Sequence, residues 1–228
     1  FETPLVAEAA LPFTASGPPA NAPIDARLRW NGELDEFWAL VPAPEHVLRG
    51  DVEIDLAING PLSAPRTSGV VRLSDGQYQN LVVGTILTDL TAESRLAEGG
   101  AFGLDVSAKD GADGTVTLDA TLDDVALDAT LEARRAVLVR RDDATARISA
   151  DIAARGDLPD LAITGNTTVD RAEIRLVNAT PPSVADLGEV RIKGAPEPEE
   201  EAAAGSTVDL DLTIRSEEIY VRGRGLDS

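Results

Sequence analysis

The side chains of this chain that could do acid–base chemistry are carboxylates in adjacent pairs: Asp123-Asp124, Asp142-Asp143 and Glu217-Glu218. Neighbours in a β-strand point to opposite faces, so such a pair cannot converge on one bond as the two carboxylates of a glycosidase do. The chain has no Cys and a single His, His46, which excludes thiol nucleophiles, thiolate metal sites and histidine-rich metal sites. We therefore expect no catalytic residue, no enzyme activity and no cofactor.

Two runs rich in Gly and Asp resemble calcium loops in composition only. Residues 110–114 lack the alternating ligands and the final Glu of an EF-hand loop, so a hairpin turn explains them more simply. Residues 99–105 miss the spacing of the calcium-binding nonapeptide by one residue. We expect no metal site.

The overall charge argues against a nucleic-acid partner. Forty acidic residues against 20 basic ones give a net charge of −20, which repels phosphate, so the Arg222-Gly223-Arg224-Gly225 run is better explained as a strand end and a bend. No run approaches the roughly 20 apolar residues of a membrane span. The chain has no Met and begins at Phe1, so we expect it to be a piece of a longer protein.

Strict alternation of apolar and polar residues is the strongest pattern in the sequence. It predicts β-strands with one dry and one wet face. The apolar members are Val52, Ile54, Leu56 and Ile58; Val116, Leu118, Ala120 and Leu122; Val125, Leu127, Ala129 and Leu131; and Val208, Leu210, Leu212 and Ile214.

Turn signals between these runs favour an all-β, mostly antiparallel fold. The signals are Asp75-Gly76, Gly99-Gly100, Asp110-Gly111 and Asp113-Gly114. Helical signal is confined to two short connectors, Glu33 to Val41 and Ser183 to Leu187. Residues 194–206 have no apolar periodicity and are expected to form a flexible acidic loop.

A weak repeat extends this picture. Gly60 and Gly69 are nine residues apart, and so are Gly156 and Gly165, each pair following an apolar strand. The repeat units, about 50–80 and 147–176, suggest an elongated, curved sheet with an open groove. We expect a partly irregular leading segment over 1–29, the groove over 30–193, and continuing strands over 207–228. An ordinary sandwich, whose dry faces pack on each other, is the alternative that periodicity leaves open.

A set of motifs in a fixed order resembles the carboxy-terminal conserved region of the TamB family, the inner-membrane subunit of the translocation and assembly module. The resemblance runs from about Trp30 to Ser228. The motifs are Gly-Pro-Leu-Ser-Ala-Pro-Arg-Thr-Ser-Gly (60–69), Asp-Gly-Gln-Tyr-Gln-Asn-Leu (75–81), Gly-Thr-Ile-Leu-Thr-Asp-Leu (84–90), Ala-Lys-Asp-Gly-Ala-Asp-Gly (108–114), Leu-Val-Arg-Arg-Asp-Asp (138–143), Val-Asp-Arg-Ala-Glu-Ile (169–174), Pro-Pro-Ser-Val (181–184) and Tyr-Val-Arg-Gly-Arg-Gly-Leu-Asp-Ser (220–228).

The resemblance implies a periplasmic segment of a protein anchored in the bacterial inner membrane by a helix outside this chain. It implies a sheet folded like a taco, related to the AsmA-like bridge-type lipid transfer proteins, whose groove carries phospholipid acyl chains between the two membranes. The alternative that it implies is a scaffold for outer-membrane barrel proteins, working with the barrel partner TamA. An extracellular structural sandwich with a closed core remains a third possibility.

Under the groove interpretation, the apolar members of the alternating runs are the candidate lipid-facing residues. They are Val52, Ile54, Leu56, Ile58, Val71, Leu73, Val116, Leu118, Leu122, Val125, Leu127, Leu131, Ile148, Ile152, Ile174, Leu176, Val208, Leu210, Leu212 and Ile214. The acidic residues between them would then form the outside of the sheet, where they add solubility and oppose self-association.

Overall fold

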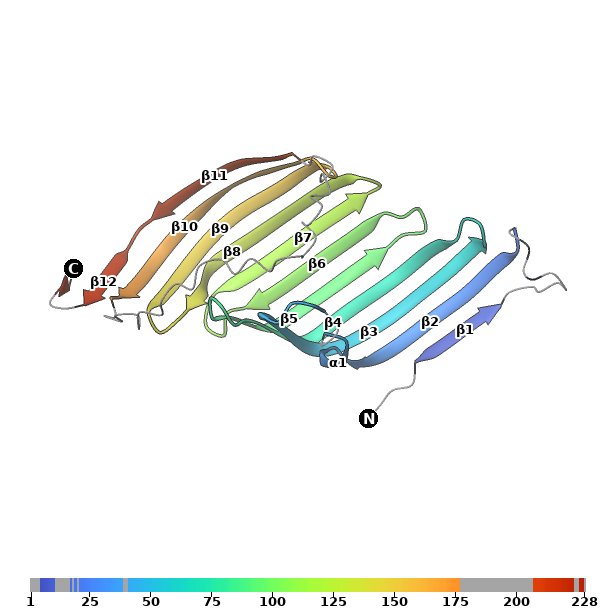
Figure 1. Cartoon of the computed structure of the whole chain (residues 1–228), viewed down its shortest axis with the longest axis horizontal. Helices are drawn as coiled ribbons and strands as arrows, with labels where there is room; N and C mark the ends of the chain where they lie inside the picture. The colour runs from blue at the N-terminus through green and yellow to red at the C-terminus, as the bar shows by residue number, and fades with distance from the viewer. Residues whose placement is uncertain are drawn as a thin grey trace, which may run out of the picture.

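The computed structural model describes residues 5–10, 17, 19, 21–38, 41–176, 207–223 and 226–227. Within these residues, thirteen strands form one sheet (Figure 1). The strands are β1 (Val6–Ala10), β2 (Pro23–Glu33), β3 (His46–Pro61), β4 (Arg66–Asn80), β5 (Thr85–Leu96), β6 (Phe102–Lys109), β7 (Thr115–Asp123), β8 (Ala126–Arg140), β9 (Ala144–Asp157), β10 (Leu161–Arg175), β11 (Val208–Ser216), β12 (Ile219–Gly223) and β13 (Leu226–Asp227).

The order of the strands is simple. Strands β1 to β10 lie side by side in chain order, each antiparallel to the one before. Strands β11 and β12 both pair with β10 and are parallel to it. The predicted all-β, elongated and curved sheet is therefore confirmed. The described residues contain no second sheet that could make it a sandwich.

Helix is almost absent from the described chain. The helix α1 (Asp35–Trp38) lies inside the segment expected to form a short connector, and it links β2 to β3. The connector expected at 183–187 and the acidic loop expected at 194–206 lie outside the described residues.

One predicted turn is wrong. Asp75 and Gly76 lie inside β4, where the pairing register shifts between Leu73 and Gly76 and Asp75 has a φ of 49°. The positive φ that Asp and Gly tolerate is used by β-bulges as well as by turns, and the local sequence does not tell the two apart. The three other signals lie where expected, between β5 and β6 and between β6 and β7.

Bulges recur at the same level of neighbouring strands and bend the sheet. Besides β4, the register shifts between Arg49 and Asp51, Thr88 and Thr91, Ala133 and Ala136, and Val169 and Arg171. Because a bulge bends its strand, a row of them folds the sheet along a line. We call this line the crease, defined by the bulge residues Gly50, Asp75, Asp89, Arg135 and Asp170.

Most of the buried apolar side chains among the described residues lie at the crease. Among the described residues, the buried apolar side chains are Ala22, Val52, Leu90, Ala108, Ala133, Ala136 and Ala150. All except Ala22 lie beside the crease, where Val116, Leu138 and Ile152 pack against three of the alanines. Small side chains let the two walls of the folded sheet approach closely, so the crease is dry while the walls above it stay open.

The short β6–β7 hairpin helps to close the crease. Its tip ends between β5 and β8, and beyond the tip these two strands are joined directly. The Arg140 backbone N–H donates to the Val83 carbonyl at 2.9 Å, and the Thr85 hydroxyl donates to the Leu138 carbonyl at 2.5 Å. The sheet therefore narrows below the hairpin, which increases its curvature.

Candidate functional site

Rows of apolar residues cross the sheet on one face. Residues directly opposite each other in a ladder share a face, so the pairing register can be followed from strand to strand. The row nearest the crease is Val52, Leu73, Ala92, Val106, Leu118, Leu131, Ile152, Gly165 and Leu212.

Two further rows run parallel to the first. The middle row is Trp30, Ile54, Val71, Ser94, Leu104, Ala120, Ala129, Ala154, Ile163 and Leu210. The outer row is Leu28, Leu56, Gly69, Leu96, Phe102, Leu122, Leu127 and Gly156. Ten strands at about 4.8 Å spacing make the middle row about 43 Å long, and Ser94 is its one polar member.

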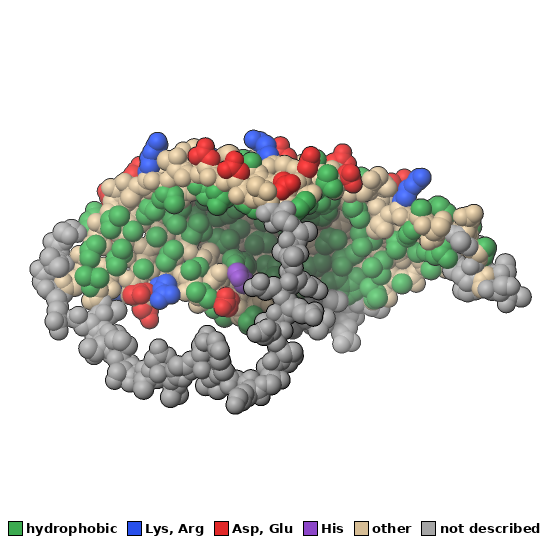
Figure 2. Space-filling view, turned by 45° about the horizontal axis from the view of Figure 1, so that its top comes forward, with side chains coloured by type: hydrophobic (Ala, Val, Ile, Leu, Met, Phe, Trp, Pro, Cys, Tyr) green, Lys and Arg blue, Asp and Glu red, His purple; other side chains and the backbone are tan. Residues whose placement is uncertain are grey.

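This face lines a hollow. Figure 2 shows hydrophobic side chains covering the concave side of the sheet, with acidic and basic side chains gathered along its upper rim. Leu56, Leu118 and Leu131 are half-buried, although each lies in the middle of a strand with neighbours on both sides. Among the described residues no second layer covers them, so the apolar rows form an open groove.

Most of the candidate residues from the sequence are placed in these rows or next to them. Ile58 extends the same face of β3 toward its end, and Val116 and Ile148 lie beside the crease. Val208 and Ile214 occupy the same face of β11, the edge strand. Val125 is different, because it lies in the turn between β7 and β8 and is 44% exposed.

Ile174 and Leu176 lie on the lower wall, which is the part of the sheet on the other side of the crease from the three rows. Ile174 pairs with Ala144 and Val221 on the lower wall, and Leu176 follows the end of β10 and packs against Gly223. Both are exposed, by 39% and 53%. They belong to the rim of the lower wall rather than to the rows above.

Sequence reasoning missed several residues that line the same face. Strand β2 contributes Leu28 and Trp30, and strand β6 contributes Phe102, Leu104 and Val106. Alternation was present in both segments and could have identified them. The Trp30 indole lies over Gly32, where a Cβ would overlap the ring.

Ion pairs lie on the opposite, convex face, both within a strand and between neighbouring strands. Arg72 lies between Glu53 at 3.6 Å and Glu93 at 2.8 Å, and Arg134 lies between Glu132 at 3.0 Å and Asp151 at 2.7 Å. The hydrogen bond from Arg72 lowers the pKa of Glu93, and the hydrogen bond from Arg134 lowers the pKa of Asp151. Such exposed pairs contribute little stability, but they match neighbouring strands in the correct register.

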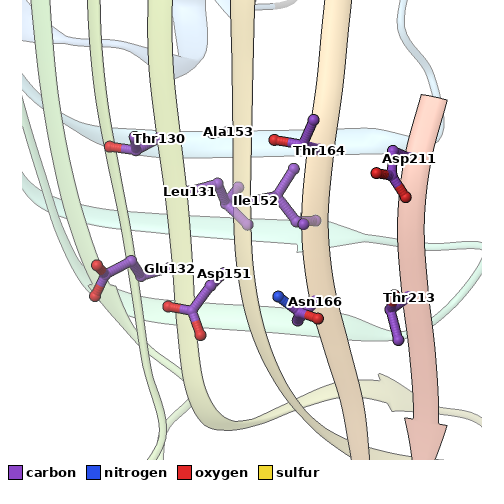
Figure 3. A pocket seen from close by; sticks show the side chains of 11 residues that line it. Thr130, Leu131, Glu132, Asp151, Ile152, Ala153, Thr164, Asn166, Asp211 and Thr213 are labelled. Carbon is purple, nitrogen blue, oxygen red and sulfur yellow. The ribbon is translucent and has the colours of Figure 1, made fainter. Parts of the chain in front are cut away.

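A shallow depression of about 420 Å³ lies among the polar residues between β8 and β11 (Figure 3). Thr130, Glu132, Asp151, Asn166 and Asp211 are among the residues that line it. Two of its carboxylates, Glu132 and Asp151, both form ion pairs with Arg134. Within the part of the chain that the structure describes, no three carboxylate or imidazole groups come together as a metal site would require.

Aromatic and polar side chains meet at one point of the lower wall. His46 Nδ1 is 2.7 Å from the Tyr78 hydroxyl, and the two rings are stacked with centroids 5.9 Å apart. The Trp38 indole N–H donates to the His46 carbonyl at 2.9 Å. These contacts join α1 to the first residue of β3 and to β4.

The comparison with known protein families gives a match. The family model described as the TamB C-terminal domain matches residues 105–228, which is more than half of the chain. No curated protein and no solved structure gives a significant match. In the described ranges there is no helix with the length and apolar character needed to cross a membrane.

Proposed function

The chain belongs to the TamB family of envelope proteins, which is associated with TamA in the translocation and assembly module, and on that premise we propose that its groove is a non-enzymatic path for phospholipid acyl chains. In this proposal the chain acts in the periplasm, as part of a protein anchored in the inner membrane. The observation that carries the proposal is the set of apolar rows that cross ten strands and that no other part of the described chain covers.

The groove matches the physical demands of lipid transfer. Two sixteen-carbon tails expose apolar surface that costs on the order of 25 kcal/mol in water, at about 0.8 kcal/mol per methylene. A continuous track of aliphatic side chains can shield the tails at every point along the sheet. Because the groove is open along its length, a polar headgroup can stay in water while its tails move. The mostly aliphatic lining offers few deep pockets in which a tail would be held.

The adjacent residues Leu118 and Asp119 provide a matched test, because they lie on opposite faces of β7. Leu118→Arg places a charge in the row nearest the crease, whereas Asp119→Arg places the same side chain on the convex face. We expect Leu118→Arg to lose most of the phospholipid that co-purifies without detergent, measured by native mass spectrometry, and Asp119→Arg to keep it. Equal lipid content in two folded variants would rule out the groove as the path.

The alternative function, a scaffold for outer-membrane barrel proteins acting with TamA, is favoured by the outer edge of β11, which no other described strand covers. An extended segment can add to such an edge through main-chain hydrogen bonds. In this case Leu212→Pro should slow barrel insertion more than Leu118→Arg does, because proline removes a backbone donor from the edge. Unchanged insertion rates in Leu212→Pro would exclude this role.

A further inference from the structure

Amphipathic aromatic side chains are concentrated at one point of the lower wall. The chain has two Trp, two Tyr and one His, and three of these side chains, Trp38, His46 and Tyr78, meet there. The one imidazole of the chain, purple in Figure 2, is seen inside the hollow. Rings that carry a polar atom are favoured where an apolar surface meets water. The cluster therefore marks such a boundary within the groove.

The imidazole of His46 is not needed to hold α1 in place. The Trp38 indole N–H donates to the backbone carbonyl of His46, not to its side chain. The imidazole contacts Tyr78, whose hydroxyl lies 2.7 Å from Nδ1. When this hydroxyl donates to Nδ1, the proton of the neutral imidazole is on Nε2. No described residue hydrogen-bonds to Nε2, so its N–H remains a donor for a ligand.

Asn80 provides a second donor beside the first. It lies directly opposite His46 in the ladder of β3 and β4, so the two side chains share a face. Its Oδ1 accepts from the backbone N–H groups of Val82 at 2.9 Å and Val83 at 3.2 Å, which fixes the amide and leaves its N–H₂ group as a donor. Among the described residues, no buried side-chain nitrogen lacks a hydrogen-bond partner, so both donors reach solvent.

This face of the lower wall is uncharged on β3, β4 and β5. The register from strand to strand places on it His46, Leu48, Tyr78, Asn80, Thr85 and Leu87. His46 is the first residue of β3 and lies four residues before Gly50 at the crease, which is about 13 Å along the strand. The two donors are therefore near the lower rim, whereas the apolar rows begin on the other side of the crease.

We propose that the Nε2–H of His46 and the amide N–H₂ of Asn80 bind the phosphodiester of a phospholipid whose tails lie in the apolar rows, an inference that rests on the proposed lipid path. The two non-bridging oxygens of a phosphodiester match two adjacent donors, and its charge strengthens both hydrogen bonds. The tails then extend toward the crease while the headgroup stays at the rim. Neutral donors bind phosphate more weakly than an arginine does, which suits a lipid that must move on.

The neighbouring charge indicates which headgroup to use as a probe. Glu45 precedes His46 and is exposed, so its carboxylate can meet the ammonium group of a zwitterionic headgroup. The net charge of −20 opposes an anionic headgroup in the same place. Phosphatidylethanolamine is therefore the probe, and diacylglycerol, which has the same tails without the phosphate, is its control.

The single imidazole gives a direct readout, because its nitrogen NMR signals are unique in the chain. We expect dioctanoyl phosphatidylethanolamine to shift the Nε2 signal of His46 and dioctanoylglycerol to leave it nearly unchanged. Native mass spectrometry of the same samples shows which lipid is bound. Equal shifts with both lipids, or no shift when both are bound, would overturn the headgroup contact and leave the groove intact. A chain that binds neither lipid would overturn the proposed function as well.

Two substitutions test the donors separately. Asn80→Asp keeps the acceptor for the turn and replaces the N–H₂ group by an oxygen that repels phosphate, and His46→Phe keeps the ring and the carbonyl that holds Trp38. We expect each to weaken phosphatidylethanolamine binding about tenfold in calorimetry, and diacylglycerol binding to stay unchanged. Asn166→Asp, opposite Asp151 on the convex face, makes the same charge change and should affect neither lipid. Parent affinity for phosphatidylethanolamine in both His46→Phe and Asn80→Asp would overturn the inference.

Discussion

The Val137 backbone N–H donates a hydrogen bond of 2.8 Å to Oδ2 of Asp110, a carboxylate with no exposed surface. Oδ1 of the same side chain accepts from the backbone N–H groups of Ala112 at 2.8 Å and Gly114 at 3.0 Å. The Arg140 guanidinium donates to the Asp110 carbonyl. One aspartate thus shapes the tip of the β6–β7 hairpin and ties it to β8 at the crease.

Removing this carboxylate should destabilise the sheet. Asp110→Asn keeps the shape but sets an amide N–H₂ against one of the backbone donors, so we expect a loss of about 3 kcal/mol at pH 7, as for a buried charged hydrogen-bond partner. The free energy of unfolding of each variant is measured by urea unfolding, followed by circular dichroism. Asp119→Asn, on the exposed face, should change stability by less than about 0.5 kcal/mol.

Asp110 should also make the stability of the sheet depend on pH. Burial by itself would raise the pKa of Asp110, but the Val137, Ala112 and Gly114 backbone donors and the Arg140 charge outweigh it and hold the pKa below its ordinary value. A carboxyl whose pKa is lowered by folding stabilises the protein above its unfolded pKa of about 3.9, and that stability is lost as pH falls through the folded value. The gap between parent and Asp110→Asn should therefore narrow below about pH 4. A constant gap from pH 7 to pH 3 would contradict this.

Two glycines within strands should respond in opposite ways to the same substitution. A Cβ on Gly165 would overlap the Asp151 carbonyl and approach the Ile152 Cα at 2.9 Å, whereas a Cβ on Gly103 would meet nothing within 4 Å. We expect Gly165→Ala to lose about 1–3 kcal/mol through overpacking, and Gly103→Ala to gain up to about 1 kcal/mol because alanine loses less backbone entropy. The melting temperatures of both variants, compared with the parent, test this expectation. Equal shifts in melting temperature would show that the close approach at Gly165 is easily relieved.

Tryptophan fluorescence should report occupancy of the groove. Trp30 lies in the middle apolar row, while Trp38 is held in α1 by its bond to His46. In a Trp38→Phe variant, which leaves Trp30 as the only tryptophan, added phospholipid should shift the emission to shorter wavelength because acyl chains replace water around the indole. Trp30→Phe, with Trp38 as the remaining reporter, should give a much smaller shift. If both variants respond equally, the lipid is not in the middle row.

Alternation predicted which residues of one strand share a face. Leu118 and Leu131, from separate runs, were both assigned to the dry face, and they lie directly opposite each other in the ladder. The rows that join them across ten strands depend on register, which long-range pairing decides, so no single run could show them. The TamB resemblance, and not the periodicity, favoured an open groove over a sandwich.

The position of the crease could not be predicted from the sequence. Asp75, Asp89 and Arg135 have φ values of 49°, 48° and 50°, yet all three lie inside strands. Asp75 with Gly76 suggested a turn, and Arg135 carries no turn signal at all. A bulge forms where both neighbouring strands tolerate it, so its position is a property of the sheet. The parallel direction of β11 was hidden for a similar reason, because strand alternation has the same period in either direction.

The chain-order arrangement of β1 to β10 has a consequence for how the protein forms. Each of these strands needs only the strand immediately before it, so the contacts are short in sequence and loop closure is inexpensive. A chain emerging from its amino-terminal end can add one strand at a time to a growing edge. Strand β11 differs, because 32 residues separate Arg175 at the end of β10 from Val208. Docking of β11 should therefore be a late and separate step, and until it occurs β10 remains the open edge.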